Sequence, residues 1–510
     1  MKERTVNLNP NAGPTVHRRA VLGMGVAAGT ASFLAACGDE SGTPQGGAGS
    51  SPATFSRADL PSGLRGKALL PGDAGYADEV KTYNLTVQHR PGVIIAAAAA
   101  SDVQAAVRLA AEKGAAVAVL ATGHQAIRSV EPGAVLVTTR AMRNVEVDPA
   151  KRTARVQAGA LWQNVIDESV KSGLAPLAGS TPIVGVVGYT VGGGLSPMMG
   201  RAHGYAADHV RNFEIVTADG ALRTVDAKTD PDLFFAVLGG KSNFGVVTAM
   251  EFGLFPVTKL FAGAMFFSGQ DAKKVLEAYR KWVSTVPDAM SSSAALLRMP
   301  DVEAVPAPLR GQLVTTVRVS YLGSPATGAR LIAPLRAAAK PLIDGVREIP
   351  FAAFPSVHAD PVDPVPAIER TALLRELTPE AIDVLIAAAG PKAAFPLSMI
   401  EMRQLGGALG RQPATPNAVS NRDAAFTLFV AGVGRPTDAA AIAAAQEAVI
   451  KAVQPWATGQ MFVNFMAAAD VAPEAVRRAY QPQAYQRLAA IKRKVDPNNM
   501  FRLNHNIAPA

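Results

Sequence analysis

The sequence GSTPIVGVVGYTVGGGLSPMMGRAHGYAADHV, residues 179–210, decides how the rest of the chain is interpreted. It is rich in glycine and has no acidic residue before Asp208. Glycines let the backbone approach a ligand closely, and successive peptide N–H groups in such conformations can bind an anion. Apolar residues, among them Val186, Val187 and Val191, alternate with the glycines, whereas a flexible surface linker would carry polar residues there. The stretch therefore predicts a packed loop that binds a phosphate-bearing cofactor.

The composition is that of a globular protein with room for two domains. Of the 510 residues, 49% are hydrophobic and 18% are charged, which suits a sizeable buried core. The net charge is +9, but the lysines and arginines are scattered rather than gathered into one run. No nucleic-acid-binding motif accompanies them. We therefore expect a solvated basic surface, no nucleic-acid partner and no metal site.

The N-terminal sequence is typical of an export signal. Arg18 and Arg19 precede an uncharged run, 23–36, which is too short to span a membrane and suits a signal peptide. The pair resembles a twin-arginine export signal, although a general secretory signal also begins with basic residues. The sequence Leu-Ala-Ala-Cys, ending at Cys37, resembles a lipobox, unless the cysteine stands there by chance. We expect an export signal over 1–37, a flexible Gly/Ser-rich tether over 38–57, and a lipoprotein anchored through Cys37 outside the bacterial cytoplasmic membrane.

From residue 90 onward, strands and helices alternate. No Gly-x-Gly-x-x-Gly opens a helix after the first strand, which argues against a Rossmann domain and for an α+β fold. The apolar runs predict strands at 92–96, 116–120, 135–138 and 153–157, and the helical spacing predicts helices at 103–113 and 161–172.

Five motifs in a fixed order carry a family resemblance. They are the turn Gly123-His124, the stretch 179–210, the segment 213–220, Asn-Phe-Gly-Val-Val-Thr at 243–248, and the segment 495–507. From about residue 88 to residue 507, the chain resembles the vanillyl-alcohol-oxidase-type FAD proteins, specifically the berberine-bridge-enzyme-like oxidoreductases. The resemblance implies a PCMH-type FAD-binding domain over 58–258, completed by a C-terminal return at 467–510 that is helical over 473–495. Between these parts, residues 259–466 would form a substrate domain with an antiparallel sheet and helices.

The resemblance also implies how FAD is held. His124 stands where the family's histidine bonds covalently to the flavin, although Thr122 and Gln125 replace the usual glycine and serine. A histidine that only hydrogen-bonds within the turn is the alternative. Thr181 stands where many relatives have a second linking cysteine, and a hydroxyl that stays protonated cannot replace a thiolate. Cys37 is the only cysteine, so we expect FAD to be linked through His124 alone.

Further cofactor contacts follow from the same motifs. The valines among these contacts could instead only pack in the core. Val184 stands at the position that controls oxygen access in the family, and a valine there favours an oxidase. The expected contacts are Thr122, Gly123, Gln125, Ser180, Thr181, Val184, Gly185, Gly188, Gly204, Ala206, Asp208, Gly245, Val246, Val247, Asn504 and Asn506.

The catalytic base is harder to assign. Two tyrosines that act as bases in relatives are replaced here by Leu195 and Phe462. Glu401 and Arg403 share one face of a predicted strand at 400–407, so Glu401 could be the base and Arg403 could position it or the substrate. The alternative is a structural ion pair. The Pro-rich segment 351–366 is expected to form a loop beside the substrate.

The expected function is oxidation of an alcohol-bearing small molecule or sugar by hydride transfer to FAD, with oxygen as acceptor. Two alternatives stay open. One is a dehydrogenase that uses a quinone or protein acceptor, and the other is a catalytically weak flavin-binding lipoprotein.

Overall fold

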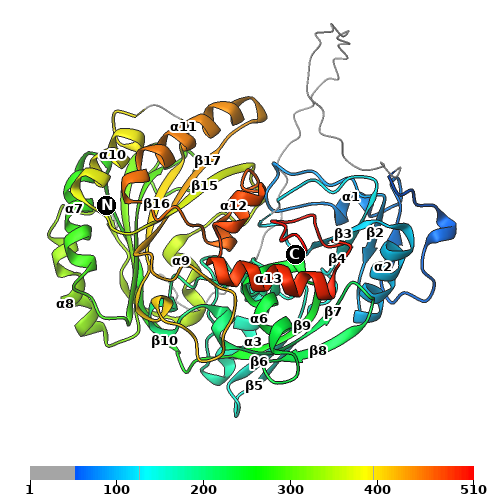
Figure 1. Cartoon of the computed structure of the whole chain (residues 1–510). Coiled ribbons are helices and arrows are strands. Elements are labelled where there is room, and N and C mark those ends of the chain that lie inside the picture. Colours follow the sequence, from blue (N-terminus) through cyan, green and yellow to red (C-terminus); the bar gives the residue numbers. More distant parts are fainter. Residues whose placement is uncertain (1–51, 126, 394–395) are drawn as a thin grey trace, which may run out of the picture. The chain divides into compact units, whose positions relative to one another are not determined.

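The computed structural model describes residues 52–125, 127–393 and 396–510, which all fall within one unit (Figure 1). Three sheets organise this unit. The predicted export signal, the lipobox with Cys37 and most of the predicted tether lie outside the described residues. The chain joins the folded body earlier than residue 58, because Ala53 and Phe55 already pack against the core around α2.

The first sheet has four strands in the order β1-β2-β4-β3, and β4 runs parallel to both β2 and β3. Its central strands are buried and apolar, as expected for a parallel sheet covered by helices. Helix α2, Ala100–Lys113, begins three residues before the predicted start, because the Asp102 carboxylate caps the N–H groups of Ala98 and Ala99. The strands are β1 Lys67–Leu69, β2 Val93–Ala96, β3 Ala116–Leu120 and β4 Ala134–Thr138.

The second sheet is antiparallel, in the order β5-β6-β9-β7-β8. Helix α3, Trp162–Ser169, packs its buried Trp162 against this sheet and continues as a 3-10 turn to Gly173. The strands are β5 Val145–Asp148, β6 Thr153–Gln157, β7 Val210–Val216, β8 Leu222–Asp226 and β9 Val246–Gly253.

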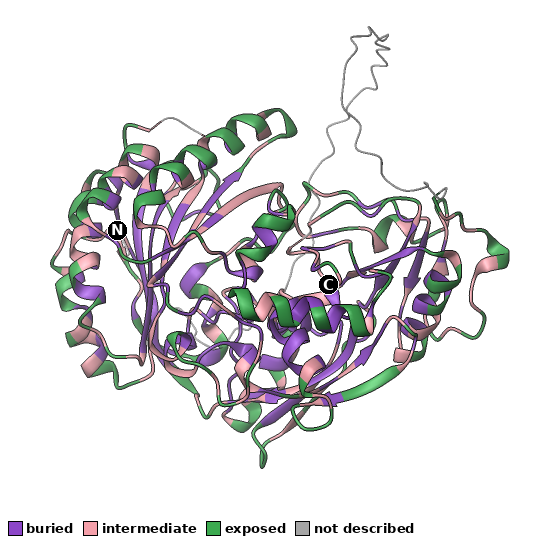
Figure 2. Cartoon of the chain, in the orientation of Figure 1, coloured by how far each residue is buried: buried purple, intermediate pink, exposed green. Residues whose placement is uncertain are grey.

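The third sheet is antiparallel, in the order β13-β10-β12-β11-β16-β17-β15, with β14 also paired to β10. One face carries apolar side chains, such as Ile400 and Leu428, that pack with the helices on the outer side (Figures 1 and 2). The strands are β10 Lys259–Ser268, β11 Met290–Arg298, β12 Leu313–Tyr321, β13 Ile343–Asp344, β14 Arg347–Pro350, β15 Ala367–Leu374, β16 Met399–Gln404 and β17 Phe426–Val433. The covering helices are α7 Ala272–Val283, α8 Pro325–Arg336, α10 Pro379–Ala389 and α11 Ala439–Ala452.

The predicted helix at 473–495 is wrong as one element. It consists of α12, Pro473–Arg477, and α13, Pro482–Val495. Pro482 lacks a backbone N–H and disfavours helical geometry at the residue before it, and Gln481 is accordingly extended (φ −65°, ψ 146°). The other helices are α1 Tyr76–Glu79, α4 Val186–Thr190, α5 Gly200–His203, α6 Pro231–Gly240 and α9 Pro355–His358.

A buried ion pair fastens the C-terminal return to the first two sheets. Lys492 and Asp496 are 2.6 Å apart and fully buried, and Lys492 also donates to the Asn243 carbonyl. Asn243 in turn hydrogen-bonds the backbone of His505 and Ile507. These contacts bring the segment around Asn504 beside the loop that precedes β9.

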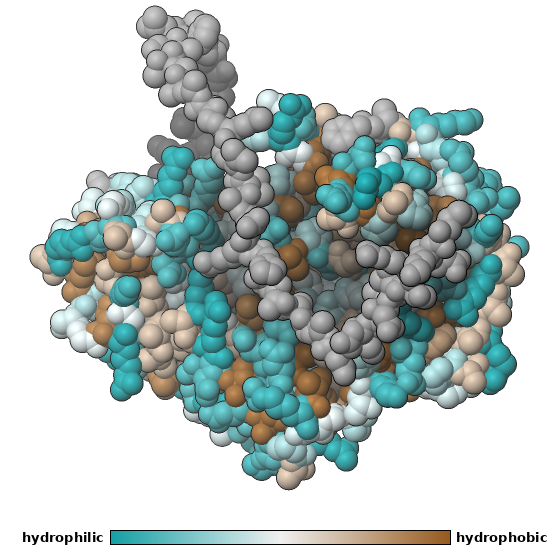
Figure 3. All heavy atoms as spheres, turned by 180° about the vertical axis from the view of Figure 1, so that it is seen from behind, coloured by the Kyte–Doolittle hydropathy of each residue, from teal (hydrophilic) through white to brown (hydrophobic). Residues whose placement is uncertain are grey.

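Hydrophilic residues are spread over the visible part of the face in Figure 3, with hydrophobic residues in small groups between them. Among the described residues, no helix combines the length and the apolar character that crossing a membrane requires.

Candidate functional site

The turn after β3 holds His124 in a defined position. The Tyr83 and Asn84 N–H groups donate to the carbonyls of Thr122 and Gly123 at 3.0 and 3.3 Å. Gly123 has φ +71°, and a Cβ there would lie 2.7 Å from the Thr82 Cβ. Only glycine fits this position, and the adjoining His124 is therefore fixed by backbone contacts.

The His124 imidazole is neutral, and only one of its two ring nitrogens has a hydrogen-bond partner. Its Nδ1 lies 3.0 Å from the Thr122 hydroxyl, its ring stacks on Tyr83, and its Nε2 is buried with no hydrogen-bond partner. Burial lowers the pKa of His124 to about 4. At neutral pH the ring therefore carries a nitrogen lone pair rather than a charge, as a nucleophilic attachment point requires.

The glycine-rich loop is packed into the core, as predicted for 179–210, rather than forming a solvated linker. Val186, Val187 and Val191 are buried in the core. Gly194 has φ +77°, and a Cβ there would lie 2.6 Å from the Tyr189 ring. Gly188 differs, because a Cβ there would meet nothing within 4 Å, so this part of the loop borders open space.

Lysine and amide groups from distant segments meet beside this loop. Lys241 donates to Gln125 Oε1, and Gln125 Nε2 donates to the carbonyls of Val463 and Met466. Asn504 Nδ2 lies 3.2 Å from the Ser242 hydroxyl. Gln125 is therefore largely occupied by protein partners, and it shapes the site more than it contacts a ligand.

The residues present fit FAD. Burying a polar atom without a partner costs about 1–3 kcal/mol, so a cluster of such atoms indicates a missing polar ligand. A dinucleotide offers phosphate oxygens and polar ring edges to such groups. Several of the buried side-chain atoms that have no partner in the described chain lie in the segments expected to hold the cofactor: His124 Nε2, Thr181 Oγ1, Tyr189 OH, Asn504 Oδ1, His505 Nδ1 and Asn506 Oδ1.

Several expected contacts have structural roles. The Asp208 carboxylate is bound by Arg422, Asn417 and the Tyr205 N–H, so it is not free for a cofactor. The side chains of Val246 and Val247 are buried in the core, so only their backbone groups could contact a cofactor. The other expected cofactor contacts lie in the glycine-rich loop and beside β9. No side-chain interaction of theirs argues for or against contact with a cofactor. They are Ser180, Val184, Gly185, Gly204, Ala206 and Gly245.

Glu401 and Arg403 lie on the polar face of the third sheet, as predicted. Glu401 is fully buried and accepts hydrogen bonds from Arg403 Nε at 2.8 Å, Arg318 Nη1 at 2.9 Å and Ser293 Oγ at 2.7 Å. Although burial opposes ionisation, the two guanidiniums hold the pKa of Glu401 well below its usual range. A carboxylate held this way is a weak base. The arrangement corresponds to the structural ion-pair alternative rather than to a catalytic base.

Glu369 is the residue that the sequence reading missed. It lies on β15 on the same face as Thr371, which is in register with Phe429 and Glu401 on the neighbouring strands. Burial raises the pKa of Glu369 to about 7, opposed by the charge of Arg403, and no hydrogen bond within the described chain stabilises its ionised form. The sequence signal that could have identified it is a glutamate among alternating residues of a strand, at a position that faces the same side of the sheet as Glu401.

The segment 351–366 crosses from the third sheet to the His124 turn. Tyr83 OH donates to the Pro361 carbonyl at 2.7 Å, and Asn84 Nδ2 donates to the Ala367 carbonyl at 2.9 Å. Burial and the charges of Asp360 and Glu369 raise the pKa of Tyr83 to about 12. Tyr83, which stacks on His124, therefore lies within the electrostatic reach of Glu369. His124 and the polar sheet face border one site.

The positions of the two tyrosines used by relatives are apolar here. Leu195 and Phe462 are both buried in the core, and Phe462 packs against the Tyr205 ring. Neither can transfer a proton.

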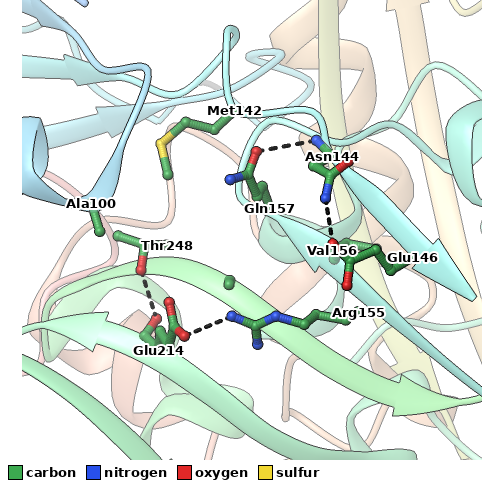
Figure 4. A pocket seen from close by; sticks show the side chains of 10 residues that line it. Ala100, Met142, Asn144, Glu146, Arg155, Val156, Gln157, Glu214 and Thr248 are labelled. Atoms are coloured by element: carbon green, nitrogen blue, oxygen red, sulfur yellow. Dashed lines mark hydrogen bonds and ion pairs between the residues drawn. The ribbon is translucent and has the colours of Figure 1, made fainter. Parts of the chain in front are cut away.

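A separate cavity of about 230 Å³ lies along the second sheet and contains none of the expected site residues (Figure 4). Its charged groups already have protein partners: Arg155 is paired with Glu214 at 2.6 Å, and Glu146 accepts a hydrogen bond from Asn144 Nδ2 at 2.8 Å. In the described ranges, no group of three or more His, Cys, Asp or Glu side chains is arranged to hold a metal ion.

Comparison with known proteins supports the cofactor and the fold. Residues 91–226 match the family described as "FAD binding domain", and residues 461–508 match "Berberine and berberine like". (R)-6-hydroxynicotine oxidase of Paenarthrobacter nicotinovorans is 26% identical over 88% of this chain and 98% of its own length.

Solved structures show the same fold. The crystal structure of 6-hydroxy-D-nicotine oxidase from Arthrobacter nicotinovorans aligns with TM-score 0.76 at 23% identity, over 88% of this chain and 99% of that chain. Chitooligosaccharide oxidase aligns with TM-score 0.73 at 19% identity, over 88% and 98%. The PCMH-type α+β fold with its antiparallel substrate-side sheet is thereby confirmed. The two family matches, together with a relative that aligns over nearly its whole length, show that the chain is similar to FAD-dependent oxidoreductases of the berberine-bridge-enzyme-like kind.

Proposed function

We propose that this protein oxidises an alcohol-bearing small molecule or sugar and passes the electrons to oxygen. One observation carries the proposal: Glu369, a carboxyl without a stabilising partner, shares its sheet face with Arg403 and acts electrostatically on the Tyr83 ring that stacks on His124. A pKa of about 7 suits a general base at neutral pH. The polar face thus combines a proton acceptor with a fixed cation.

Bound FAD would supply the hydride acceptor for this reaction. The chain would hold it with the glycine-rich loop, the Asn504–Asn506 segment and, by covalent attachment, the His124 ring. Its unpartnered Nε2 and its neutral state support His124 as the attachment point. Thr181 leaves no thiol for a second bond.

In the proposed reaction, ionised Glu369 takes the proton of the substrate hydroxyl as its carbon loses a hydride. Arg403, fixed by its bond to Glu401, orients the hydroxyl and stabilises developing negative charge. The Glu401 cluster would serve as a rigid support for Arg403, and its low basicity keeps it from competing for the proton.

Relatives with different printed activities justify a broad substrate panel. They include a 6-hydroxynicotine oxidase, a chitooligosaccharide oxidase and a glucose dehydrogenase. The test is anaerobic bleaching of the bound flavin by sugars, alcohols and 6-hydroxynicotine, followed by hydrogen peroxide and dye-reduction assays in air. Bleaching by an alcohol with stoichiometric peroxide supports an oxidase. Dye reduction without peroxide indicates a dehydrogenase, and no bleaching by any compound contradicts catalysis.

We also propose that the protein is exported and anchored to the outer side of the bacterial cytoplasmic membrane through a lipid on Cys37. The support is the sequence alone, since residues 1–51 lie outside the described structure. Changing Arg18 and Arg19 together to lysine should leave the precursor in the cytoplasm, and Cys37→Ala should abolish labelling by a radioactive fatty acid. Unchanged export of the double variant would argue for the general secretory route.

A further inference from the structure

Lys241 is a half-buried lysine that has no acidic partner in the described part of the chain. Its only side-chain hydrogen bond there is to Gln125 Oε1, and burial lowers the pKa of its ammonium to about 7. The contrast with Lys492 is direct, since that buried lysine is paired with Asp496 at 2.6 Å. Removing a charge from water is unfavourable unless it is paired, so a negatively charged ligand beside Lys241 would stabilise its ammonium form.

The backbone conformation at Lys241 also indicates that its side chain has a function. The residue has φ +55° and follows Gly239 and Gly240 at the end of α6. A non-glycine residue in this region is strained, and glycine would adopt the same conformation without strain. A lysine kept at such a position indicates that its side chain has a use there.

The surroundings of Lys241 indicate where that negative partner would lie. Gln125 adjoins His124 and also binds the carbonyls of Val463 and Met466. The same segment rests on the polar face of the third sheet, since Thr371 Oγ1 donates to the Phe465 carbonyl at 2.8 Å. Lys241 therefore lies where the FAD-binding half meets the substrate-side sheet.

We propose that Lys241 stabilises the negative charge that the flavin ring of FAD acquires on reduction. Hydride transfer adds two electrons and one proton to the ring and thus leaves one net negative charge on it. A half-buried ammonium beside the ring would favour that state and raise the reduction potential of the flavin. The inference rests on the proposed redox function, and it names a residue that the motif reading did not include.

The test uses the FAD-loaded protein and three variants. Lys241→Met removes the charge, Lys241→Arg keeps it, and Lys241→Gly removes it while relieving the backbone strain. The readouts are the two-electron midpoint potential, measured against a reference dye, and the affinity for sulfite, which adds to oxidised flavin and leaves a negative charge on the ring. Neither readout needs a substrate, so each stands even if every substrate in the panel fails.

Lys241→Met and Lys241→Gly should both bind sulfite at least tenfold more weakly, with a potential lower by about 30 mV, the equivalent of a tenfold change for a two-electron couple. Lys241→Arg should stay within threefold of the natural protein. Unchanged potential and sulfite affinity in the two neutral variants overturn the proposal. Faster loss of FAD from both, with the potential of the retained flavin unchanged, also overturns it and indicates a role at the pyrophosphate.

Discussion

The ring of Tyr83 lies parallel to the imidazole of His124, with centroids 4.0 Å apart and planes inclined by 9°. The stack links the turn after β3 to the segment 361–367, because Tyr83 OH donates to the Pro361 carbonyl. It fixes the plane of the imidazole, whose Nε2 has no hydrogen-bond partner. The orientation of the attachment residue thus depends on a side chain outside its own turn.

Removing the stack should loosen His124. Aromatic pairs contribute about 0.5–1.5 kcal/mol, so Tyr83→Ala should lower stability by at least that amount and reduce the fraction of covalently bound flavin. Tyr83→Phe keeps the ring and should retain most of the flavin. Thermal unfolding and the flavin absorbance of acid-precipitated protein measure the two effects. Full flavin attachment in Tyr83→Ala would show that the stack is dispensable.

Glu369→Gln should lower the rate of flavin reduction by about 10²–10⁴-fold, the usual contribution of a general base. The flavin spectrum should not change, because Glu369 is not expected to hold the cofactor. Glu376→Gln, an exposed glutamate two residues past the end of β15, is the matched control and should have no effect. A Glu369→Gln enzyme that reduces its flavin at the natural rate would rule out this base.

The rate of flavin reduction should rise with pH through about 7 as Glu369 ionises. The ionised form is the base, so activity is low below this pH and reaches a plateau above it. Stopped-flow reduction between pH 5 and 9 measures the profile. A flat profile, or a fall over this range, would be inconsistent with a carboxylate base whose pKa is about 7.

Glu401→Gln should destabilise the protein more than it slows the chemistry. It leaves Arg318 and Arg403 buried without their shared carboxylate, and breaking a buried pair costs about 3–5 kcal/mol. Chemical denaturation monitored by tryptophan fluorescence measures the loss. Natural stability combined with a large loss of flavin reduction would instead make Glu401 the base.

Glu401 also sets an acid limit on stability. Its pKa is lowered in the folded state, so its contribution is complete above the usual carboxyl pKa and is lost as pH falls toward the lowered value. The natural protein should therefore lose stability below about pH 4.5, the ordinary range of a glutamate. Glu401→Gln should lose less over the same range. The stability of the two proteins is measured in parallel as the pH is lowered. An equal loss of stability in both would assign the effect to other carboxyls.

Local patterns were sufficient for the cofactor half of the molecule. Strands β3 and β6 occur at the predicted residues, and the His124 turn and the glycine-rich loop are packed as their motifs indicate. These features depend on neighbouring residues: apolar runs, glycine conformations and turn geometry. Pro482 shows the limit even there, since its effect on Gln481 divides the predicted C-terminal helix in two.

Long-range contacts explain what the sequence left open at the site. Arg318, which binds Glu401, is 83 residues away in the chain, and Lys241 meets Gln125 across 116 residues. Whether a carboxyl is paired decides its pKa, and pairing of this kind is invisible to periodicity. The sequence therefore selected Glu401, which is fully paired, and passed over Glu369, which is not.

The most direct measurement is the mass of the proteolytic peptide that contains His124, taken from protein purified with its yellow colour. We predict that this peptide carries the added mass of FAD, that the colour stays in the acid-precipitated pellet, and that His124→Ala transfers the colour to the supernatant. An unmodified His124 peptide from the yellow protein, or a covalent flavin found on another residue, would contradict the assignment of this site.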